Sequence, residues 1–225
     1  RTSGENVGTY AISQGNLANS NYAITFVSAD LTIDARPLTI TATNRTKTFG
    51  DADPSLAYTI TTGSLVGSDA LSGSVSRNSG ENIGNYVIGQ GTLANSNYAI
   101  TFNNGSFVIN GANQSGFTLS AASTLVTYQD TTTLSTSGGN GNGTVAYEVT
   151  DGTGGCTISG NTVTAVAAGT CVISATKAQE GNYNAATSNN VTITVARRAQ
   201  IVTFTKPADR NFSTTAFTLA PSVDS

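Results

Sequence analysis

Apolar and polar residues alternate along several short stretches in the first half of the chain. Leu38, Ile40 and Ala42 alternate with threonines, so one face of this stretch is apolar and the other is polar. The same alternation recurs in residues 56–60, 86–88, 98–102 and 107–109. A period of two residues is typical of half-buried β-strands. Asn104-Gly105 separates the last two stretches and predicts a tight hairpin between them.

A direct repeat organises these stretches. Residues 1–34 align with residues 77–110 without a gap at an offset of 76, and 21 of the 34 aligned positions are identical. A match at one fixed offset indicates duplicated modules. We therefore expect residues 1–34 to be the C-terminal half of one module and residues 35–110 to be a complete module. The joint Asp34-Ala35-Arg36-Pro37 is short, and Pro37 favours an extended, semi-rigid connection.

The second half of the chain lacks this repeat and begins with a polar linker at Gly111. Glycine, asparagine and serine then separate seven short apolar stretches, which are 117–119, 124–128, 144–149, 156–158, 162–166, 170–176 and 191–195. Short strands at this spacing predict an immunoglobulin-like β-sandwich over residues 111–198, with a tight hairpin at Ser159-Gly160-Asn161. Apolar stretches at 201–205 and 217–219 predict that residues 199–225 start a further immunoglobulin-like module that is truncated.

The predicted fold class is therefore all-β, a tandem of small β modules in which the repeated module is a β-sandwich or is β-grasp-like. The composition removes several classes of function. The chain has no histidine, the usual general base and metal ligand. Its 10 Lys and Arg residues are scattered and its net charge is -3, so we expect no nucleic-acid binding. No apolar run approaches the roughly 20 residues that span a bilayer, so we expect no membrane insertion of this segment.

Cys156 and Cys171 are the two cysteines of the chain. They could form a reactive dithiol or half of a metal site, but a zinc site needs about four ligands and neither histidine nor further cysteine is available. The other interpretation is a disulfide between neighbouring strands of the sandwich, which implies an oxidising compartment.

We predict no catalytic residues, no cofactor and no metal site. Asp51 and Asp53 are weak calcium candidates because their alternate spacing lets two carboxylates point together, although the same residues suit a tight turn.

Several residues of the complete module form a recognisable set of motifs. They are Lys47-Thr48-Phe49-Gly50-Asp51-Ala52-Asp53-Pro54, Leu56, Tyr58, Gly63-Ser64-Leu65, Gly80, Gly84, Tyr86, Gly91, Leu93, Asn97-Tyr98-Ala99-Ile100-Thr101-Phe102 and Ile109. With this set, residues 1–110 resemble the MBG-type repeat domains of large bacterial surface proteins. The second half resembles the bacterial immunoglobulin-like repeats found beside such modules, and it does so through residues 156–158, 163, 168–173 and 182–186.

The resemblance implies a structural spacer or stalk segment of a large repetitive extracellular adhesin or surface filament protein, and not an enzyme. The alternative is a glycan- or protein-binding module. Tyrosines recur at equivalent repeat positions and could stack on sugars or pack in the core, namely Tyr10, Tyr22, Tyr86 and Tyr98. The expected partners are neighbouring modules of the same chain. Further candidate partners are host or matrix glycans or proteins, and other copies that associate laterally along an uncharged edge strand such as Leu38–Thr43.

Overall fold

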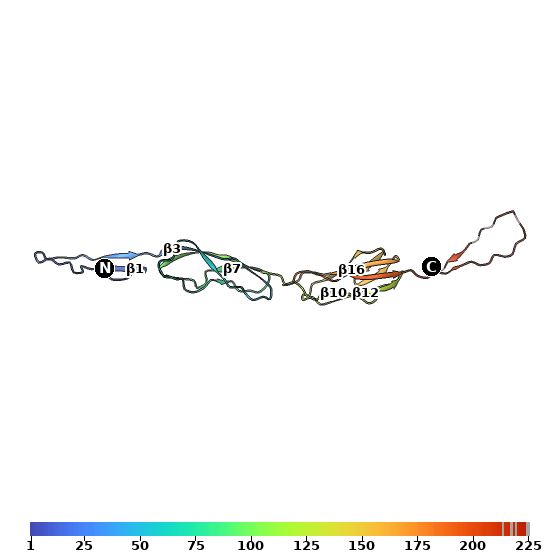
Figure 1. The fold of residues 1–225 in the computed structure, drawn as a ribbon, viewed down its shortest axis with the longest axis horizontal. Helices are drawn as coiled ribbons and strands as arrows, with labels where there is room; N and C mark the ends of the chain where they lie inside the picture. Colours follow the sequence, from blue (N-terminus) through green and yellow to red (C-terminus); the bar gives the residue numbers. More distant parts are fainter. Residues whose placement is uncertain (213, 217, 219, 224–225) are drawn as a thin grey trace. The chain divides into compact units, whose positions relative to one another are not determined.

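The computed structural model describes residues 1–212, 214–216, 218 and 220–223, and these residues form two compact units. The first unit comprises residues 1–112 together with 181–183, and the second comprises residues 113–180 and 184–225. The described residues contain strands and no helix, so the predicted all-β fold class is confirmed (Figure 1). No helix that could cross a membrane is present among these residues.

The first unit covers the residues for which the repeat predicts a half module and a complete module, and we keep these two names for residues 1–34 and 35–110. In residues 1–34, β1 (Gly8–Ile12) and β2 (Ala29–Ile33) form an antiparallel pair. The complete module has two sheets, with strand orders β5-β3-β8 and β4-β9-β7-β6. Their bounds are β3 (Arg36–Ala42), β4 (Arg45–Thr48), β5 (Tyr58–Thr62), β6 (Ser76–Arg77), β7 (Gly84–Gly89), β8 (Tyr98–Asn103) and β9 (Gly105–Asn110). Of the two predicted alternatives, the module is a sandwich.

The first and last segments of the module run side by side in the same direction. β3 pairs in parallel with β8, and β4 pairs in parallel with β9. Both segments change sheets at equivalent points, at Asn44 and at Asn104, and the Asn44 side chain accepts a hydrogen bond from the Ser106 N–H at 2.8 Å. The hairpin predicted at Asn104-Gly105 is therefore wrong, because β8 and β9 belong to different sheets.

Two further sequence predictions about β3 need correction. β3 lies between β5 and β8, so Leu38–Thr43 is not an exposed edge that could pair with another copy. The joint before it is also shorter than predicted, because Arg36 and Pro37 already belong to β3 and only Asp34 and Ala35 connect the two strands.

The core of the complete module contains apolar residues from both halves of the repeat. Its largest side chains are at most 1% exposed, and they are Leu38, Ile40, Ile88, Leu93, Phe107 and Ile109. In the half module, the residues equivalent to Ile88 and Leu93 are Ile12 and Leu17, which are 39% and 58% exposed. The difference arises because residues 1–34 contain no counterparts of β3–β6. Burial of the apolar face therefore requires both halves of a module.

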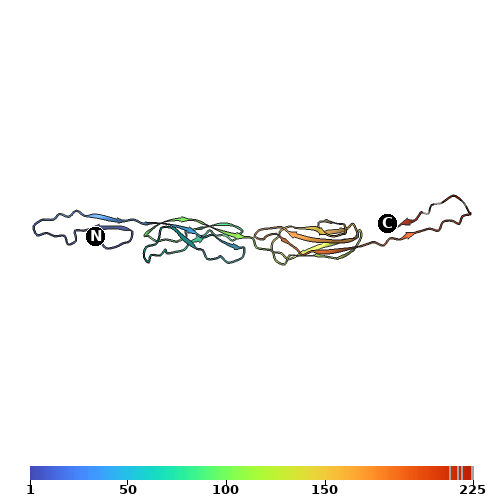
Figure 2. The ribbon, with the colours of Figure 1, turned by 45° about the horizontal axis from the view of Figure 1, so that its top comes forward.

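The second unit contains a two-sheet sandwich, drawn in yellow to orange in Figure 2. Its strand order, taken from the pairing of the strands, is that of an immunoglobulin-type domain. One sheet has the order β10-β12-β15-β14, and the other has the order β11-β18-β16-β13 with β17 also paired to β16. Their bounds are β10 (Thr118–Ala121), β11 (Leu125–Thr127), β12 (Thr131–Ser137), β13 (Val145–Asp151), β14 (Cys156–Ser159), β15 (Thr162–Ala165), β16 (Gly169–Lys177), β17 (Ala186–Thr187) and β18 (Val191–Ala196). The predicted hairpin at Ser159-Gly160-Asn161 joins β14 to β15.

The strand β12 is the main element that the apolar pattern missed. Its inward positions include Thr132, which is 5% exposed, so a polar residue stands where the pattern requires an apolar one. The Thr132 hydroxyl accepts a hydrogen bond from the Ser123 N–H at 3.0 Å and donates one to the Ser123 carbonyl at 3.1 Å. These bonds satisfy the hydroxyl, so its burial is tolerated.

Near the end of the chain, β19 (Val202–Thr203) pairs antiparallel with β20 (Ser222–Val223). The predicted strand 201–205 is thus shortened, and the predicted stretch 217–219 lies in part outside the described residues. Ile201 and Phe212 are 66% and 96% exposed. The start of a further module in this segment, like the other predicted domain boundaries, stays a prediction.

Candidate functional site

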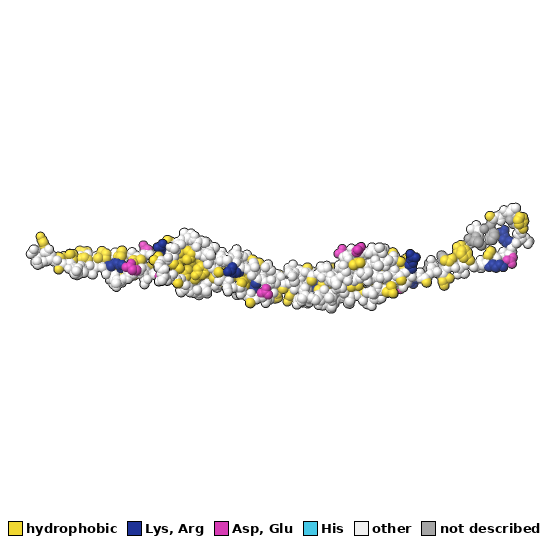
Figure 3. All heavy atoms as spheres, in the orientation of Figure 1, with side chains coloured by type: hydrophobic (Ala, Val, Ile, Leu, Met, Phe, Trp, Pro, Cys, Tyr) yellow, Lys and Arg dark blue, Asp and Glu magenta, His cyan; other side chains and the backbone are white. Residues whose placement is uncertain are grey.

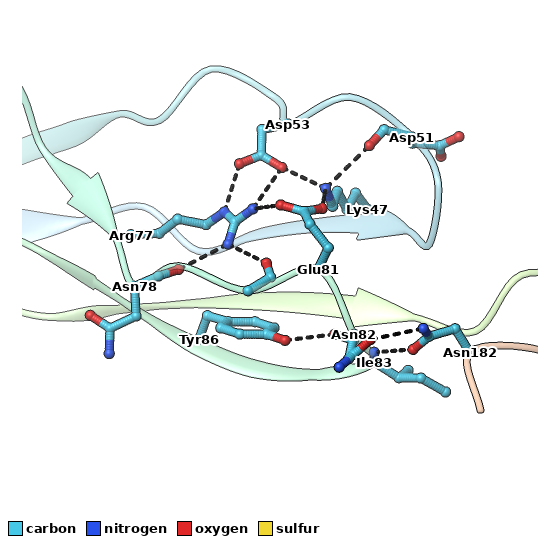
Figure 4. A network of polar contacts seen from close by, with 11 residues as sticks. Lys47, Asp51, Asp53, Arg77, Asn78, Glu81, Asn82, Ile83, Tyr86 and Asn182 are labelled. Atoms are coloured by element: carbon cyan, nitrogen blue, oxygen red, sulfur yellow. Dashed lines mark hydrogen bonds and ion pairs between the residues drawn. The ribbon is translucent and has the colours of Figure 1, made fainter.

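Charged side chains are few on the face of the molecule shown in Figure 3. Four charged side chains gather in the complete module, and we call them the charge clamp: Lys47, Asp53, Arg77 and Glu81 (Figure 4). Lys47 belongs to β4, Asp53 to the loop that follows it, Arg77 to β6 and Glu81 to the loop before β7. The charge clamp therefore ties two loops to two strands of one sheet.

The two cations of the charge clamp are buried, and the two carboxylates lie nearer to solvent. The Lys47 side chain is 4% exposed and its Nζ lies 2.7 Å from Asp53 Oδ1. Arg77 forms two bonds to the Asp53 carboxylate, from Nε at 2.6 Å and from Nη2 at 3.1 Å. Glu81 accepts hydrogen bonds from both Lys47 and Arg77. Two positive and two negative charges thus compensate each other, which a buried lysine requires.

The hydrogen bonds of the charge clamp fix its charge state. Hydrogen bonds from Arg77, followed in size of effect by those from Lys47, lower the pKa of Asp53 to about 2. Bonds from Lys47 and then Arg77 lower the pKa of Glu81, and bonds to Asp53 and then Glu81 raise the pKa of Lys47. All four groups are therefore charged at neutral pH. Because a general acid or base needs a pKa near the working pH, the clamp is suited to holding loops together and not to proton transfer.

The two calcium candidates do not point together. Asp53 faces Lys47 and Arg77, whereas the Asp51 carboxylate points away and only its backbone oxygen accepts a hydrogen bond from Lys47 Nζ, at 3.2 Å (Figure 4). Within the described part of the chain, no group of three or more His, Cys, Asp or Glu side chains is placed to hold a metal ion. Two cationic side chains bound to Asp53 would also repel a metal cation there.

Half of the charge clamp recurs in the half module. Arg77 lies over the Tyr86 ring at 5.5 Å, and the equivalent Arg1 lies over Tyr10 at 5.3 Å. Gly80 has a φ of 140°, and a Cβ placed there would lie 2.3 Å from the Tyr86 ring, which is why glycine stands at this repeat position. The equivalents of Lys47 and Asp53 fall outside residues 1–34. Arg1 also forms an ion pair with Glu5, the equivalent of Glu81. The sequence signal for the charge clamp was thus the recurrence of an arginine and a glutamate four residues apart, at 1 and 5 and at 77 and 81.

The recurring tyrosines act as packing residues in the complete module. Tyr98 is 6% exposed, and its hydroxyl accepts the Val66 N–H at 2.7 Å and donates to Asp69 at 2.8 Å. The Tyr86 hydroxyl donates to the Asn82 carbonyl at 2.8 Å. Tyr22 is 75% exposed in the half module, where the strands that would cover it have no counterpart. These contacts favour core packing over sugar stacking.

Cys156 and Cys171 form a disulfide in the second unit. Cys156 lies in β14 and Cys171 in β16, which belong to different sheets, so the bond links the two layers and not neighbouring strands as the sequence suggested. Cys171 is fully buried in the core of the sandwich. The bond therefore acts as a cross-link within a folded domain.

The joint between the half module and the complete module is a second polar site, and sequence reasoning missed it. A single residue, Asn97, makes three hydrogen bonds there. Its backbone oxygen accepts the Arg36 N–H at 2.9 Å, its side-chain oxygen accepts the Val7 N–H at 3.0 Å, and its side-chain nitrogen donates to the Asn6 side chain at 3.0 Å. Through Asn97, the complete module thus forms hydrogen bonds both to the first residue of β3, next to the connecting segment, and to a loop of the half module.

Comparison with known proteins identifies the first half of the chain. Residues 1–32 and 38–108 match the family model of the MBG domain (YGX type). No curated protein and no solved structure matches the chain.

Proposed function

The first half of the chain is built of MBG-type modules, and from this we propose that the chain is a spacer or stalk segment of a large repetitive extracellular adhesin or surface filament protein. MBG domains are a non-catalytic, structural type of repeat domain that occurs in surface proteins. The adhesin, its extracellular location and the mechanical role of this segment are the proposed part. Neighbouring modules of the same chain are the proposed partners.

The observation that carries the proposal is the joint between the half module and the complete module. Only Asp34 and Ala35 separate β2 from β3, and Asn97 bonds to residues on both sides of this connection. A short connection with such cross-bonds limits the freedom of two neighbours to bend against each other. A spacer needs this property, whereas a binding module does not require it.

The chemistry of the described residues supports the same role. The four groups of the charge clamp are each ionised at neutral pH and their charges sum to zero, so none of them is poised to act as a general acid or base. Tyr86 and Tyr98 of the complete module are occupied by packing and by hydrogen bonds.

Single-molecule force spectroscopy of the chain tests the proposal. The complete module should unfold in one step, and its 76 residues should then span about 25 nm in place of the folded module's length, since an extended residue spans about 3.4 Å. The sandwich of the second unit should extend in a second step, which lengthens by about 5 nm on reduction because the disulfide closes a separation of 15 residues. Smooth extension at low force, without steps, would refute the proposal that this segment is a spacer that resists stretching.

A further inference from the structure

The three hydrogen bonds of Asn97 recur at a second place in the first unit. The Asn182 backbone oxygen accepts the Ala112 N–H at 3.0 Å, and its side-chain oxygen accepts the Ile83 N–H at 2.8 Å. Its side-chain nitrogen donates to the Asn82 side chain at 2.9 Å (Figure 4). Asn82, Ile83 and Ala112 stand 76 residues after Asn6, Val7 and Arg36. Residues at equivalent repeat positions therefore present the same three groups, two backbone N–H donors and one asparagine side-chain acceptor, to Asn97 and to Asn182.

The two asparagines that bind these groups come from sequences that are not repeats of each other. Asn97-Tyr98 belongs to the MBG-type module, and Asn182-Tyr183 belongs to the stretch that lacks the repeat. In both cases the tyrosine pairs in parallel with the residue that follows the module, Tyr98 with Arg36 and Tyr183 with Ala112. An Asn-Tyr turn is thus a shared connector that recognises the Glu-Asn-Val or Glu-Asn-Ile loop of a module.

A third Asn-Tyr turn lies in the half module, at Asn21-Tyr22. It has the same local geometry as its equivalent: the Asn21 N–H donates to the Asn19 side chain at 2.8 Å, as the Asn97 N–H donates to Asn95 at 2.9 Å. The turn is therefore formed before any loop binds. Asn21 and Tyr22 are exposed, and within the described part of the chain no loop occupies the Asn21 side chain.

We propose that Asn21-Tyr22 is a docking site for the Glu-Asn-Val or Glu-Asn-Ile loop of a further MBG-type module. The occupant follows from the other two connectors, each of which holds this loop with the same three bonds. The Asn21 side chain accepts the N–H of the loop's Val or Ile and donates to the loop asparagine, while its backbone oxygen accepts the N–H that follows the module. The inference rests on the tandem arrangement proposed above.

The test extends the chain ahead of Arg1 with a copy of residues 35–110 followed by a copy of residues 35–76. The copy of 35–76 completes the half module, because it supplies the 42 residues that precede position 77 in the repeat. The copy of 35–110 places its own Asn82-Ile83 loop next to Asn21. Hydrogen exchange of the backbone N–H of this copied Ile83 is measured by NMR. Asn21→Ala should speed this exchange by about five-fold or more, which is the effect expected from losing one hydrogen bond.

Two further variants make the result decisive. Asn16→Ala changes an exposed asparagine of the same half module that belongs to no connector, and it should leave the exchange unchanged. Asn97→Ala in the same molecule should speed exchange of the Val7 N–H and shows the size of the effect at a connector that the structure contains. Equal exchange at the copied Ile83 in the parent, Asn21→Ala and Asn16→Ala chains would overturn the docking site. Stepwise unfolding under force would still be observed, so that outcome would not refute the spacer role.

Discussion

Reduction of the Cys156–Cys171 bond should destabilise the sandwich of the second unit selectively. The bond closes a separation of 15 residues and joins β14 of one sheet to β16 of the other. A cross-link lowers the entropy of the unfolded chain, and for a loop of 15 residues this stabilises the folded state by about 3 kcal/mol. Reduction leaves the Cys171 sulfur in the core and the Cys156 sulfur partly buried against it, and it removes no atoms that fill the core, so this entropy is the main quantity that changes.

Urea unfolding followed by NMR measures the effect, because cross-peaks from the two units report their transitions separately. A domain of this size loses about 1.5 kcal/mol of stability per molar urea, so a loss of about 3 kcal/mol should lower the midpoint of the sandwich by about 2 M. The complete MBG-type module contains no cysteine and serves as the internal control, with a midpoint that should not move.

A midpoint of the sandwich that shifts by less than about 0.5 M on reduction would refute this reasoning, since the disulfide would then contribute less than about a quarter of the predicted stabilisation. An equal shift in both units would refute it as well, because it would show that the reductant acts on the chain in general. The double variant Cys156→Ala with Cys171→Ala should show a shift at least as large as reduction. It removes the buried Cys171 sulfur in addition to the cross-link.

Two further predictions concern the complete module. Gly80→Ala should lower the free energy of unfolding of this module by about 2 kcal/mol or more, because φ is positive there and the added Cβ would clash with the Tyr86 ring. The control is Gly50→Ala, which adds only backbone strain because φ is 90° and its Cβ would meet no atom within 4 Å, so equal losses of stability in urea titrations of the two variants would contradict the packing argument. The free energy of unfolding of the same module should fall between pH 4 and pH 2, because the pKa of Asp53 is lowered from 3.8 to about 2 and its ionised form, which stabilises the folded state, is lost as the group is protonated. Asp53→Asn should flatten the dependence of the urea midpoint on pH, and an unchanged profile would show that other carboxyl groups are responsible.

The fold was largely predictable because the two kinds of module follow simple patterns. In the MBG-type module the alternation of Leu38, Ile40 and Ala42 with threonines places one face in the core, and the structure buries those three residues. The exact 76-residue offset located the repeat without any structural information. β12 escaped prediction because Thr132 is buried through hydrogen bonds to Ser123, and a pattern of apolar residues carries no trace of such bonds.

Topology was less predictable than strand content. Asn104-Gly105 has the composition of a hairpin turn, but local sequence does not tell whether two strands pair with each other or cross between sheets. The crossing is decided by distant residues, since Asn44 binds the Ser106 N–H and Ala42 packs against Gly105. Such contacts join positions about 60 residues apart and leave no periodic signal.

The polar sites could be found from the sequence only by comparing the repeats. Lys47 has acids nearby in the sequence, but its second partner, Glu81, lies 34 residues away, so the charge clamp has no compact motif. The connector at Asn97 was visible only as an Asn-Tyr pair, which occurs at 21, 85, 97 and 182, although Asn85 lies within β7 and forms no connector. Its role depends on backbone N–H groups of a loop about 90 residues away, which the identity of side chains does not reveal.

The parallel pairing of the first and last segments has a mechanical consequence. In the complete module the first two strands, β3 and β4, pair in parallel with the last two strands, β8 and β9. In the second unit the early strand β11 likewise pairs in parallel with the late strand β18. A pull applied to the two ends of such a pair loads its hydrogen bonds in shear, so that the whole row has to rupture together. Antiparallel neighbours pulled from adjacent ends would instead unzip one bond at a time and yield at a lower force.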